Sequence, residues 1–470
     1  MHHFIALKLY FMLVPIILII LFLILIVPNL DYFKQAKASE LVSDKPPEVF
    51  SPNMKVEQIF QKNFEKPPGT LSSVSSMTFL GIDDILLLNK NNGTVHRILN
   101  GSFFEEPLLD VNVANNRERG LLGIASSTYS IPNDDRHAVL KYIFLYYTET
   151  NKDGNDVCPK KYICEPGDSG NRLYRYELQE NKLVNPKLLL DLPAAPGPGH
   201  NGGVIAIGPD NYVYVTIGDL NAHLNERYWT KAQNFRNGTD PDGRSGILRI
   251  TQDGKTVGDG ILGRNHPLNK YYAYGIRNSF GIDFDPVMGN LWDTENGPEY
   301  GDEINLVKPG FNSGWNQIQA IWRPTYGEVQ GADYIAGMKS LNPDNVLVNF
   351  GGNGKYSPPE FIWKKTVSPT AIKFFHSDRY GKDYKDDLFV GDYNNGYLYH
   401  FDLNKSRSEL LLDGRLEDKI ADSPEELEKL IFANGFNKIL DLEVGPDGYL
   451  YILSEGNQYI NIFKIMPTNP

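Results

Sequence analysis

Cysteine and net positive charge are both scarce in this sequence. Cys158 and Cys164 are the only cysteines among 470 residues, and a short polar stretch separates them. Such a pair is suited to form one disulfide in an oxidising compartment, and two free thiols are the alternative. A metal site would need further ligands nearby, and the sequence offers none. Lysine and arginine total 46 against 58 aspartate and glutamate residues, which gives a formal net charge of -12. A general nucleic-acid binder needs a basic surface, so nucleic acid is not an expected partner.

Two redox-cofactor motifs are also absent. The sequence has no Cys-x-x-Cys-His, the attachment motif of c-type haem. No Gly-x-Gly-x-x-Gly follows a predicted strand and opens a helix, so a nicotinamide-binding fold is not expected. A redox enzyme with this sequence would therefore pass its electrons to an external acceptor.

Long apolar runs are absent except near the N-terminus. Residues 9–28 carry no charge and are long enough to cross a bilayer as a helix. A small-residue cleavage pattern, Ala36-Lys37-Ala38, follows this run. We predict an N-terminal transmembrane or signal helix within residues 1–30 and a polar stalk at residues 31–60. The remainder, residues 61–470, would be an extracellular or periplasmic domain at the cell membrane, or would be secreted.

Strand signals dominate after residue 60. Short runs rich in Val, Ile, Tyr and Leu alternate with Asn-Gly, Asp-Gly and Pro-Asp-Gly turns. Four segments resemble one another as strand–turn–strand units: residues 207–219, 284–296, 388–402 and 444–456. Loose repeats favour a radial array, because each small sheet needs neighbours to cover its faces. Units of roughly 65–70 residues in about 410 residues would make an all-β, six-bladed β-propeller.

One helix is predicted within this β-rich region, at residues 423–434. Ser423 can cap its start, Pro424 fits its first turn, and Glu426 completes a capping box. Gly435 is a suitable terminator. We expect this helix to be a loop insertion packed on the propeller.

His200 lies in a bend that has few other side chains. Six of the ten residues at 194–203 are Gly or Pro, and His200 is the only ionisable residue among them. An imidazole can take a proton from a hydroxyl near neutral pH, and glycines let a ligand approach the backbone closely. His200 is therefore a candidate base, and an exposed loop histidine is the alternative.

Arg277 and Asn278 stand together between two glycines, Gly275 and Gly281. Arginine offers a fixed fork of donors, and asparagine offers both a donor and an acceptor. Such a pair could orient a carbonyl or carboxylate group of a ligand. The alternative is a structural turn in which Asn278 bonds the backbone.

Residues 294–315 combine acidic side chains with a Gly-Pro pair. The acidic residues are Glu295, Glu299, Asp302 and Glu303, and the pair is Gly297 and Pro298. Carboxylates and freed backbone carbonyls suit Ca²⁺, although the spacing is not that of an EF-hand loop. Solvent-facing turn residues are the alternative.

In this order, the segments resemble the glucose/sorbosone dehydrogenase family, which includes soluble quinoprotein glucose dehydrogenases and aldose sugar dehydrogenases. The resemblance covers about residues 65–466. It is carried by "ERGLLGIA" (118–125), "GHNGGVIAIGPDNYVYVTIGD" (199–219), "YGIRNSFGIDFDPVMGNLW" (274–292), "ENGPEYGDEINLVKPGFNSGW" (295–315), "SPPEFIWKKTVSPTAIKFF" (357–375) and "DLEVGPDGYLYILSE" (441–455).

The resemblance implies a six-bladed propeller that holds pyrroloquinoline quinone (PQQ) and Ca²⁺ on one axial face. His200 would remove the proton of a sugar hydroxyl while hydride passes to the quinone. Arg277 would lie against the reacting quinone oxygen and act with His200 in catalysis. The remaining implied contacts are Asn278, Thr366 and Lys438 to the cofactor, and the carbonyls of Gly297 and Pro298 to the calcium ion.

The sequence departs from the family pattern at several positions. Glu118 replaces a Gln before "GLLG", and Asn394 replaces a Lys after the "LFVG" strand. Lys438 and Leu440 stand where quinone-binding members carry two Arg. PQQ is a tricarboxylate, so losing about two cations should weaken its binding.

The predicted function is PQQ- and calcium-dependent oxidation of an aldose or similar alcohol, as a quinoprotein sugar dehydrogenase with an external electron acceptor. Two alternatives stay open. One is a non-catalytic extracellular binding module that has lost PQQ, and the other is a calcium-dependent lactone hydrolase. The presence of His200, Arg277 and Asn278 favours an enzyme, whereas the missing cations favour the binding module.

Overall fold

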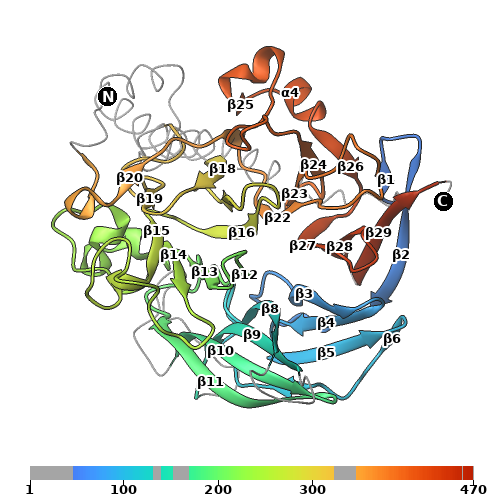
Figure 1. Cartoon of the computed structure of the whole chain (residues 1–470), viewed down its shortest axis with the longest axis horizontal. Helices are drawn as coiled ribbons and strands as arrows, with labels where there is room; N and C mark the ends of the chain where they lie inside the picture. Colours follow the sequence, from blue (N-terminus) through green and yellow to red (C-terminus); the bar gives the residue numbers. More distant parts are fainter. Residues whose placement is uncertain (1–45, 131–138, 152–168, 322–345, 458, 469–470) are drawn as a thin grey trace, which may run out of the picture. The chain divides into compact units, whose positions relative to one another are not determined.

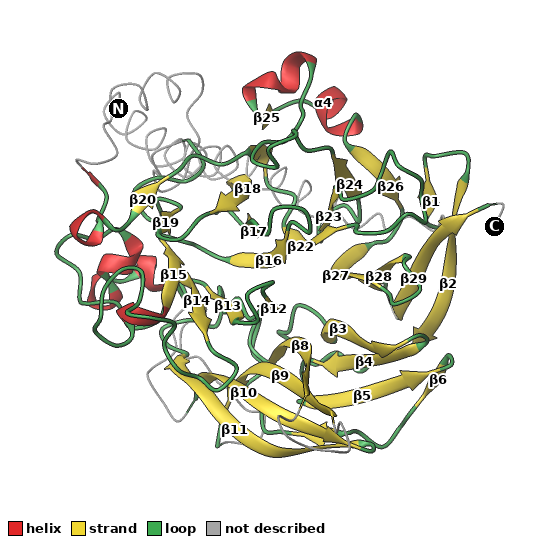
Figure 2. Cartoon of the chain, viewed as in Figure 1, coloured by secondary structure: helices red, strands yellow, loops and turns green. Residues whose placement is uncertain are grey.

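Strands account for most of the regular structure, as the sequence predicts (Figure 2). The computed structural model describes residues 46–468 apart from 131–138, 152–168, 322–345 and 458. The chain divides into two units, Met1–Lys45 and Pro46–Pro470, and the first lies wholly outside the described residues. The predicted N-terminal helix and both cysteines therefore also lie outside them. Within the described ranges, none of the helices combines the length and apolar character that a bilayer span demands.

The described strands form six sheets (Figure 1). Three of them consist of β3 (Val74–Gly81), β4 (Asp84–Asn89), β5 (Thr94–Leu99), β6 (Ser102–Phe103) and β7 (Leu109–Asp110); of β8 (Leu121–Ser130), β9 (Val139–Glu149), β10 (Gly170–Gln179) and β11 (Lys182–Pro193); and of β12 (Ile205–Ile207), β13 (Val213–Ile217), β14 (Gly246–Ile250), β15 (Tyr271–Tyr274), β19 (Phe311–Asn312) and β20 (Lys355–Tyr356).

The other three sheets consist of β16 (Ser279–Phe284), β17 (Leu291–Glu295), β18 (Tyr300–Val307), β21 (Phe361–Lys365) and β25 (Ile420–Ala421); of β22 (Pro369–Phe374), β23 (Leu388–Asp392), β24 (Leu398–Phe401), β26 (Ile431–Asn434) and β1 (Glu48–Val49); and of β27 (Lys438–Val444), β28 (Leu450–Glu455), β29 (Ile460–Pro467) and β2 (Met54–Lys62). The described helices are α4 (Pro424–Glu428) and the short 3₁₀ turns η1 (Ala222–Leu224), η2 (Glu226–Tyr228), η3 (Lys231–Gln233), η4 (Leu268–Lys270), η5 (Phe350–Gly352) and η6 (Gly414–Asp418).

The sheets surround a common centre, with β3, β8, β12, β16, β22 and β27 innermost (Figure 1). Each inner strand packs against the next one, and β27 returns to β3. The four repeated segments form antiparallel pairs, as predicted: β12 with β13, β16 with β17, β23 with β24, and β27 with β28. This radial arrangement is a β-propeller.

Apolar side chains fill the spaces between neighbouring sheets. Six buried clusters each combine residues from two adjacent sheets. In one of them, Tyr146 and Leu173 pack with Val215 and Leu248 of the next sheet. Middle strands such as β13 and β23 are buried on both faces, so their sequences are mostly apolar and lack a regular polar alternation.

The ring of sheets closes through pairing of β2 with β29. Gln61 of β2 donates to the Oδ1 of Asn461 at 3.1 Å, across 400 positions of sequence. The predicted boundary at residue 60 is therefore wrong, because β2 spans it and β1, which pairs with β26, also belongs to a sheet of the propeller. β2 contains mostly polar residues, so its sequence alone resembles that of a polar stalk. Its place in the propeller depends on β29, which lies at the other end of the sequence.

The predicted helix begins where expected but ends early. Ser423 accepts from the backbone N–H of Glu426 at 3.4 Å, and Glu426 accepts from that of Ser423 at 3.2 Å, so the capping box forms. The helix stops at Glu428, and Ile431–Asn434 form β26, which pairs with β24 and β1. Strand pairing with two partners overrides the weak helical preference of so short a segment.

Ile462→Ala should lower the free energy of unfolding by about 2–5 kcal/mol, because it opens a cavity in a packed core. Ile462 lies on β29 and is fully buried in the cluster next to β2. Chemical denaturation followed by tryptophan fluorescence measures the change. Ile82→Ala is the matched control, since Ile82 is 65% exposed. Equal effects of the two variants would contradict the assigned closing core.

Candidate functional site

A cavity of about 440 Å³ runs between the inner strands at the centre of the propeller. His200, Arg277, Asn278, Gly297 and Pro298, all predicted site residues, line this cavity. They come from three connections, which join β11 to β12, β15 to β16, and β17 to β18. Residues distant in sequence thus meet because their sheets share one centre.

Two predicted cofactor contacts, Thr366 and Lys438, are not among the cavity-lining residues. Each instead contacts a residue that does line it. The carbonyl of Thr366 accepts from the side-chain amide of Asn394 at 3.3 Å. The Nζ of Lys438 lies 4.9 Å from the ring centroid of Tyr393. Both residues thus stand one layer behind the cavity wall.

The backbone of the Gly-rich bend at His200 lies close to two other segments of the chain, at Gly218 and at Arg277. His200 has a φ of 61°, in the left-handed region. A Cβ on Gly218 would come within 2.5 Å of the carbonyl oxygens of both His200 and Arg277. Glycine is therefore required where the His200 bend and the Arg277 connection approach each other.

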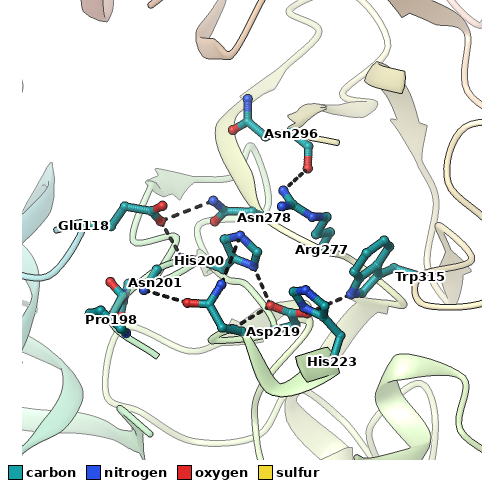
Figure 3. Close-up of polar contacts among 12 residues, drawn as sticks. Glu118, Pro198, His200, Asn201, Asp219, His223, Arg277, Asn278, Asn296 and Trp315 are labelled. Carbon is teal, nitrogen blue, oxygen red and sulfur yellow. Dashed lines mark hydrogen bonds and ion pairs between the residues drawn. The ribbon is translucent and has the colours of Figure 1, made fainter. Parts of the chain in front are cut away.

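His200 is held by a buried carboxylate (Figure 3). Its Nδ1 lies 2.5 Å from Oδ1 of Asp219, and its backbone N–H donates to Oε2 of Glu118 at 2.5 Å. Asp219 is fully buried, and His200 is 7% exposed. An Nδ1–H that donates to Asp219 leaves Nε2 as an acceptor, and the Asn221 amide nitrogen lies 3.4 Å from it.

Asp219 also binds two other side chains. Its Oδ2 lies 2.5 Å from Nδ1 of His223 and accepts from the indole N–H of Trp315 at 2.8 Å. Burial works to raise the pKa of Asp219, but His223 and His200 hold it well below the usual range. Asp219 is therefore an anion that fixes the orientation of His200.

Burial lowers the pKa of His200 below its ordinary value, with a further contribution from Arg277. Asp219 and Glu118 oppose this shift without cancelling it. His200 is therefore neutral at neutral pH. A neutral imidazole with its Nδ1–H held by a carboxylate can accept a proton at Nε2.

Arg277 and Asn278 each keep a polar atom without a partner. Nη1 of Arg277 donates to the carbonyl of Asn296 at 2.8 Å, and Asn278 donates to Glu118 at 3.3 Å (Figure 3). Nε of Arg277 and Oδ1 of Asn278 are buried and have no hydrogen-bond partner among the described residues. Burial lowers the pKa of Arg277, although an arginine stays protonated at neutral pH. A ligand in the cavity could satisfy both atoms.

The acidic segment is mostly buried, contrary to the interpretation as solvent-facing turns. Glu295, Asp302 and Glu303 are each at most 1% exposed, whereas Glu299 is exposed. Asp302 accepts from the backbone N–H of Gly297 at 2.8 Å and from those of Val367 and Ser368 at 2.7 Å. Burial raises the pKa of Asp302 to about 6. Asp302 thus ties the Gly297–Pro298 turn to the segment that contains Thr366.

Several site residues were missed in the sequence. Asp219 is the last residue of the repeat "IGPDNYVYVTIGD", so its position directly after a strand was a usable signal. His223 and Asn221 follow in the next turn, four and two residues later. Lys90 also lines the cavity. No sequence pattern indicated this position, because a lysine in a polar turn is ordinarily exposed.

Comparisons with known proteins point to one family. The family model for glucose/sorbosone dehydrogenases matches residues 71–462. The chain is 25% identical to aldose sugar dehydrogenase YliI of Escherichia coli over 279 residues, covering 59% of this chain and 63% of the relative. It is 31% identical to quinoprotein glucose dehydrogenase B of Acinetobacter calcoaceticus over 338 residues, covering 69% and 65%. The chain thus spans less than two thirds of the length of either relative.

A solved structure shares the fold. It is the PQQ-bound form of aldose sugar dehydrogenase from Streptomyces coelicolor, with a TM-score of 0.53 and 19% sequence identity. The match covers 88% of this chain and 99% of that one. At this identity the likeness shows a common propeller fold and nothing finer.

Asp219→Asn should lower the pKa of His200 further, because the charge of Asp219 is one of the interactions that raise it. NMR titration of the full-length chain with isotope-labelled histidine measures the shift. Asp210→Asn, in an exposed turn, is the control and should leave the His200 pKa unchanged. A pKa of His200 above 6.5 in the unmodified protein, or a rise on Asp219→Asn, would contradict the assigned electrostatics.

Proposed function

Because this chain belongs to the glucose/sorbosone dehydrogenase family, we propose that it is a quinoprotein that oxidises an aldose or similar alcohol with PQQ and calcium. The observation that carries the proposal is the neutral His200 held by Asp219 beside Arg277 and Asn278 on one cavity. The names of the relatives support it, since one is a quinoprotein and a structural neighbour is PQQ-bound.

The size of the cavity and several of its polar groups suit an anionic cofactor. Its volume of about 440 Å³ lies within the usual range for small-molecule sites. The buried Nε of Arg277 is a donor and the buried Oδ1 of Asn278 is an acceptor, and neither has a partner among the described residues. Lys90 and Arg117 add positive charge to the cavity wall. These groups match the oxygens and carboxylates of PQQ.

Calcium would be bound by the carbonyls of Gly297 and Pro298. Both residues line the cavity, and Asp302 fixes their turn by accepting from the N–H of Gly297. Backbone carbonyls are hard oxygen ligands of the type that Ca²⁺ prefers. A Cβ on Gly297 would come within 2.0 Å of the carbonyl oxygen of Tyr300, so only glycine permits this turn.

In the proposed reaction, Nε2 of His200 accepts the proton of the substrate hydroxyl. Asp219 keeps the proton of His200 on Nδ1 and stabilises the imidazolium that forms. Bound PQQ supplies the two-electron acceptor that takes up the hydride. Arg277 holds the reacting groups in line and offers positive charge where negative charge develops.

The proposal extends to architecture and location. Each of the six sheets would be one blade of a six-bladed propeller. The N-terminal helix would anchor or export it, so that the domain works outside the cytoplasm with an external electron acceptor.

A second candidate is a binding module without PQQ. The specific observation in its favour is that Asn394 and Leu440 both line the cavity and are uncharged, at positions where the family resemblance implies cations. Titration of the calcium-loaded full-length chain with PQQ, followed by absorption, decides between the candidates. Binding supports the dehydrogenase, and its absence even with calcium favours the binding module.

His200→Ala should reduce aldose oxidation by roughly 10²–10⁴-fold, because a general base acts mainly in the transition state. PQQ affinity should stay close to that of the unmodified protein. Turnover with an artificial electron acceptor and absorption titration provide the two measurements. His376→Ala is the matched control, since the His376 side chain is 65% exposed and lies outside the cavity wall. Retained turnover in His200→Ala would remove His200 from the mechanism.

Arg277→Ala should impair both PQQ binding and turnover, because the guanidinium would contact the cofactor and stabilise charge. A charge-assisted hydrogen bond corresponds to roughly 10–150-fold in affinity. Titration and steady-state kinetics of the same preparation measure the two effects. If PQQ affinity were unchanged, Arg277 would not be a cofactor ligand.

A further inference from the structure

Lys90 is a buried lysine on the wall of the central cavity. It follows β4 directly, lines the cavity and is 3% exposed. It lies within the residues that the family model matches, but in none of the motifs that carry the family resemblance. A buried ammonium group normally has a carboxylate partner, because an unpaired charge is costly to remove from water.

The Nζ of Lys90 has only neutral partners. It donates to the carbonyl of Arg117 at 2.9 Å and to Oδ1 of Asn91 at 3.2 Å. It forms no ion pair within 4.0 Å with any carboxylate of the described residues. The nearby Glu455 is instead bound by Lys66, at 2.9 Å. Lys90 is therefore a buried amino group that has no carboxylate partner at short range.

The other lysine of the cavity wall behaves differently. Lys373 lies 3.1 Å from Glu443 and 3.8 Å from Asp283, and both pairs are ion pairs. These partners raise the pKa of Lys373, whereas burial lowers the pKa of Lys90 to about 7. Lys373 is thus paired with carboxylates of the protein, whereas Lys90 is not.

We propose that Lys90 forms an anion subsite that binds a carboxylate of the quinone cofactor, in place of the cations missing at Asn394 and Leu440. This inference rests on the proposed function. It explains how the cavity can hold a tricarboxylate although two cationic positions are neutral. A carboxylate beside Lys90 would provide the charge partner that the protein omits.

Binding of an anion at this subsite should change the protonation of Lys90. Bound carboxylate favours the charged lysine, so anion binding raises the pKa of Lys90 from about 7. Above about pH 7, Lys90 is mostly neutral before the anion binds, so the protein must take up a proton when the anion binds. The charged groups that act on Lys90 are Glu118 from the loop before β8, Glu455 from β28, and Lys66, whereas Arg117 contacts Lys90 through its backbone carbonyl. Glu118 and Glu455 raise the pKa of Lys90 and Lys66 lowers it, so none of them removes the expected uptake.

Calorimetric titration of the calcium-loaded full-length chain with PQQ tests the proposal. Lys90→Gln should weaken PQQ binding about 10- to 150-fold, the effect of one charge-assisted hydrogen bond. Lys90→Arg should bind within a few-fold of the unmodified protein. Lys141→Gln is the matched control, because Lys141 is a half-buried lysine that donates to the carbonyl of Leu80 and lies outside the cavity wall, so this variant should bind PQQ almost normally.

A second measurement does not depend on the folding of Lys90→Gln. At about pH 8, the unmodified protein should take up a proton on binding PQQ, seen as a dependence of the binding heat on the buffer. Lys90→Arg should take up none, because arginine stays charged. If Lys90→Gln binds like the unmodified protein, if Lys141→Gln is equally weakened, or if no proton is taken up, the subsite is refuted. If the unmodified protein binds no PQQ, the proposed function itself fails instead.

Discussion

The pairing of β2 with β29 is the constraint on which the rest of the molecule depends. It joins the two ends of the propeller and lets β27 pack against β3, so that the inner strands form a closed ring. Only in a closed ring do connections from different sheets face one cavity. The apolar clusters between neighbouring sheets make this closure favourable, because every sheet buries both of its faces.

Behind the cavity wall, the Asp219 carboxylate organises the polar groups around His200. It is buried, anionic and bonded to His200, His223, Trp315 and a backbone N–H. The cost of burying a carboxylate is offset by these four interactions. One consequence is a histidine that is oriented by charge yet neutral, which is the state in which an imidazole can accept a proton. Electrostatics and packing thus fix the orientation of His200 and favour its neutral state.

Charged groups of both signs surround the cavity. Its wall carries the basic side chains of Lys90, Arg117, Arg277 and Lys373 and the acidic side chains of Glu118, Asp441 and Glu443. Glu295, Asp302 and Glu303 are buried behind the Arg277 connection, and burial raises the pKa of each of them. Lys90 differs from Lys373, because its Nζ contacts only neutral acceptors.

The sequence by itself determined the β class, the four hairpins and the start of the helix at Ser423. Local signals are sufficient there, because turn residues, β-branched runs and capping boxes act over a few positions. It also drew attention to His200, Arg277, Asn278 and the Gly297–Pro298 pair, since Gly-rich bends with isolated polar groups are unusual.

Only the tertiary structure decided the rest. The boundary at β2, the strand at Ile431–Asn434 and the pairing of His200 with Asp219 all depend on partners distant in sequence or on another strand. Lys90 shows this most clearly, because nothing local to a lysine in a polar turn reveals that it is buried. Burial and charge pairing are properties of the closed ring, and periodicity along the chain does not encode them.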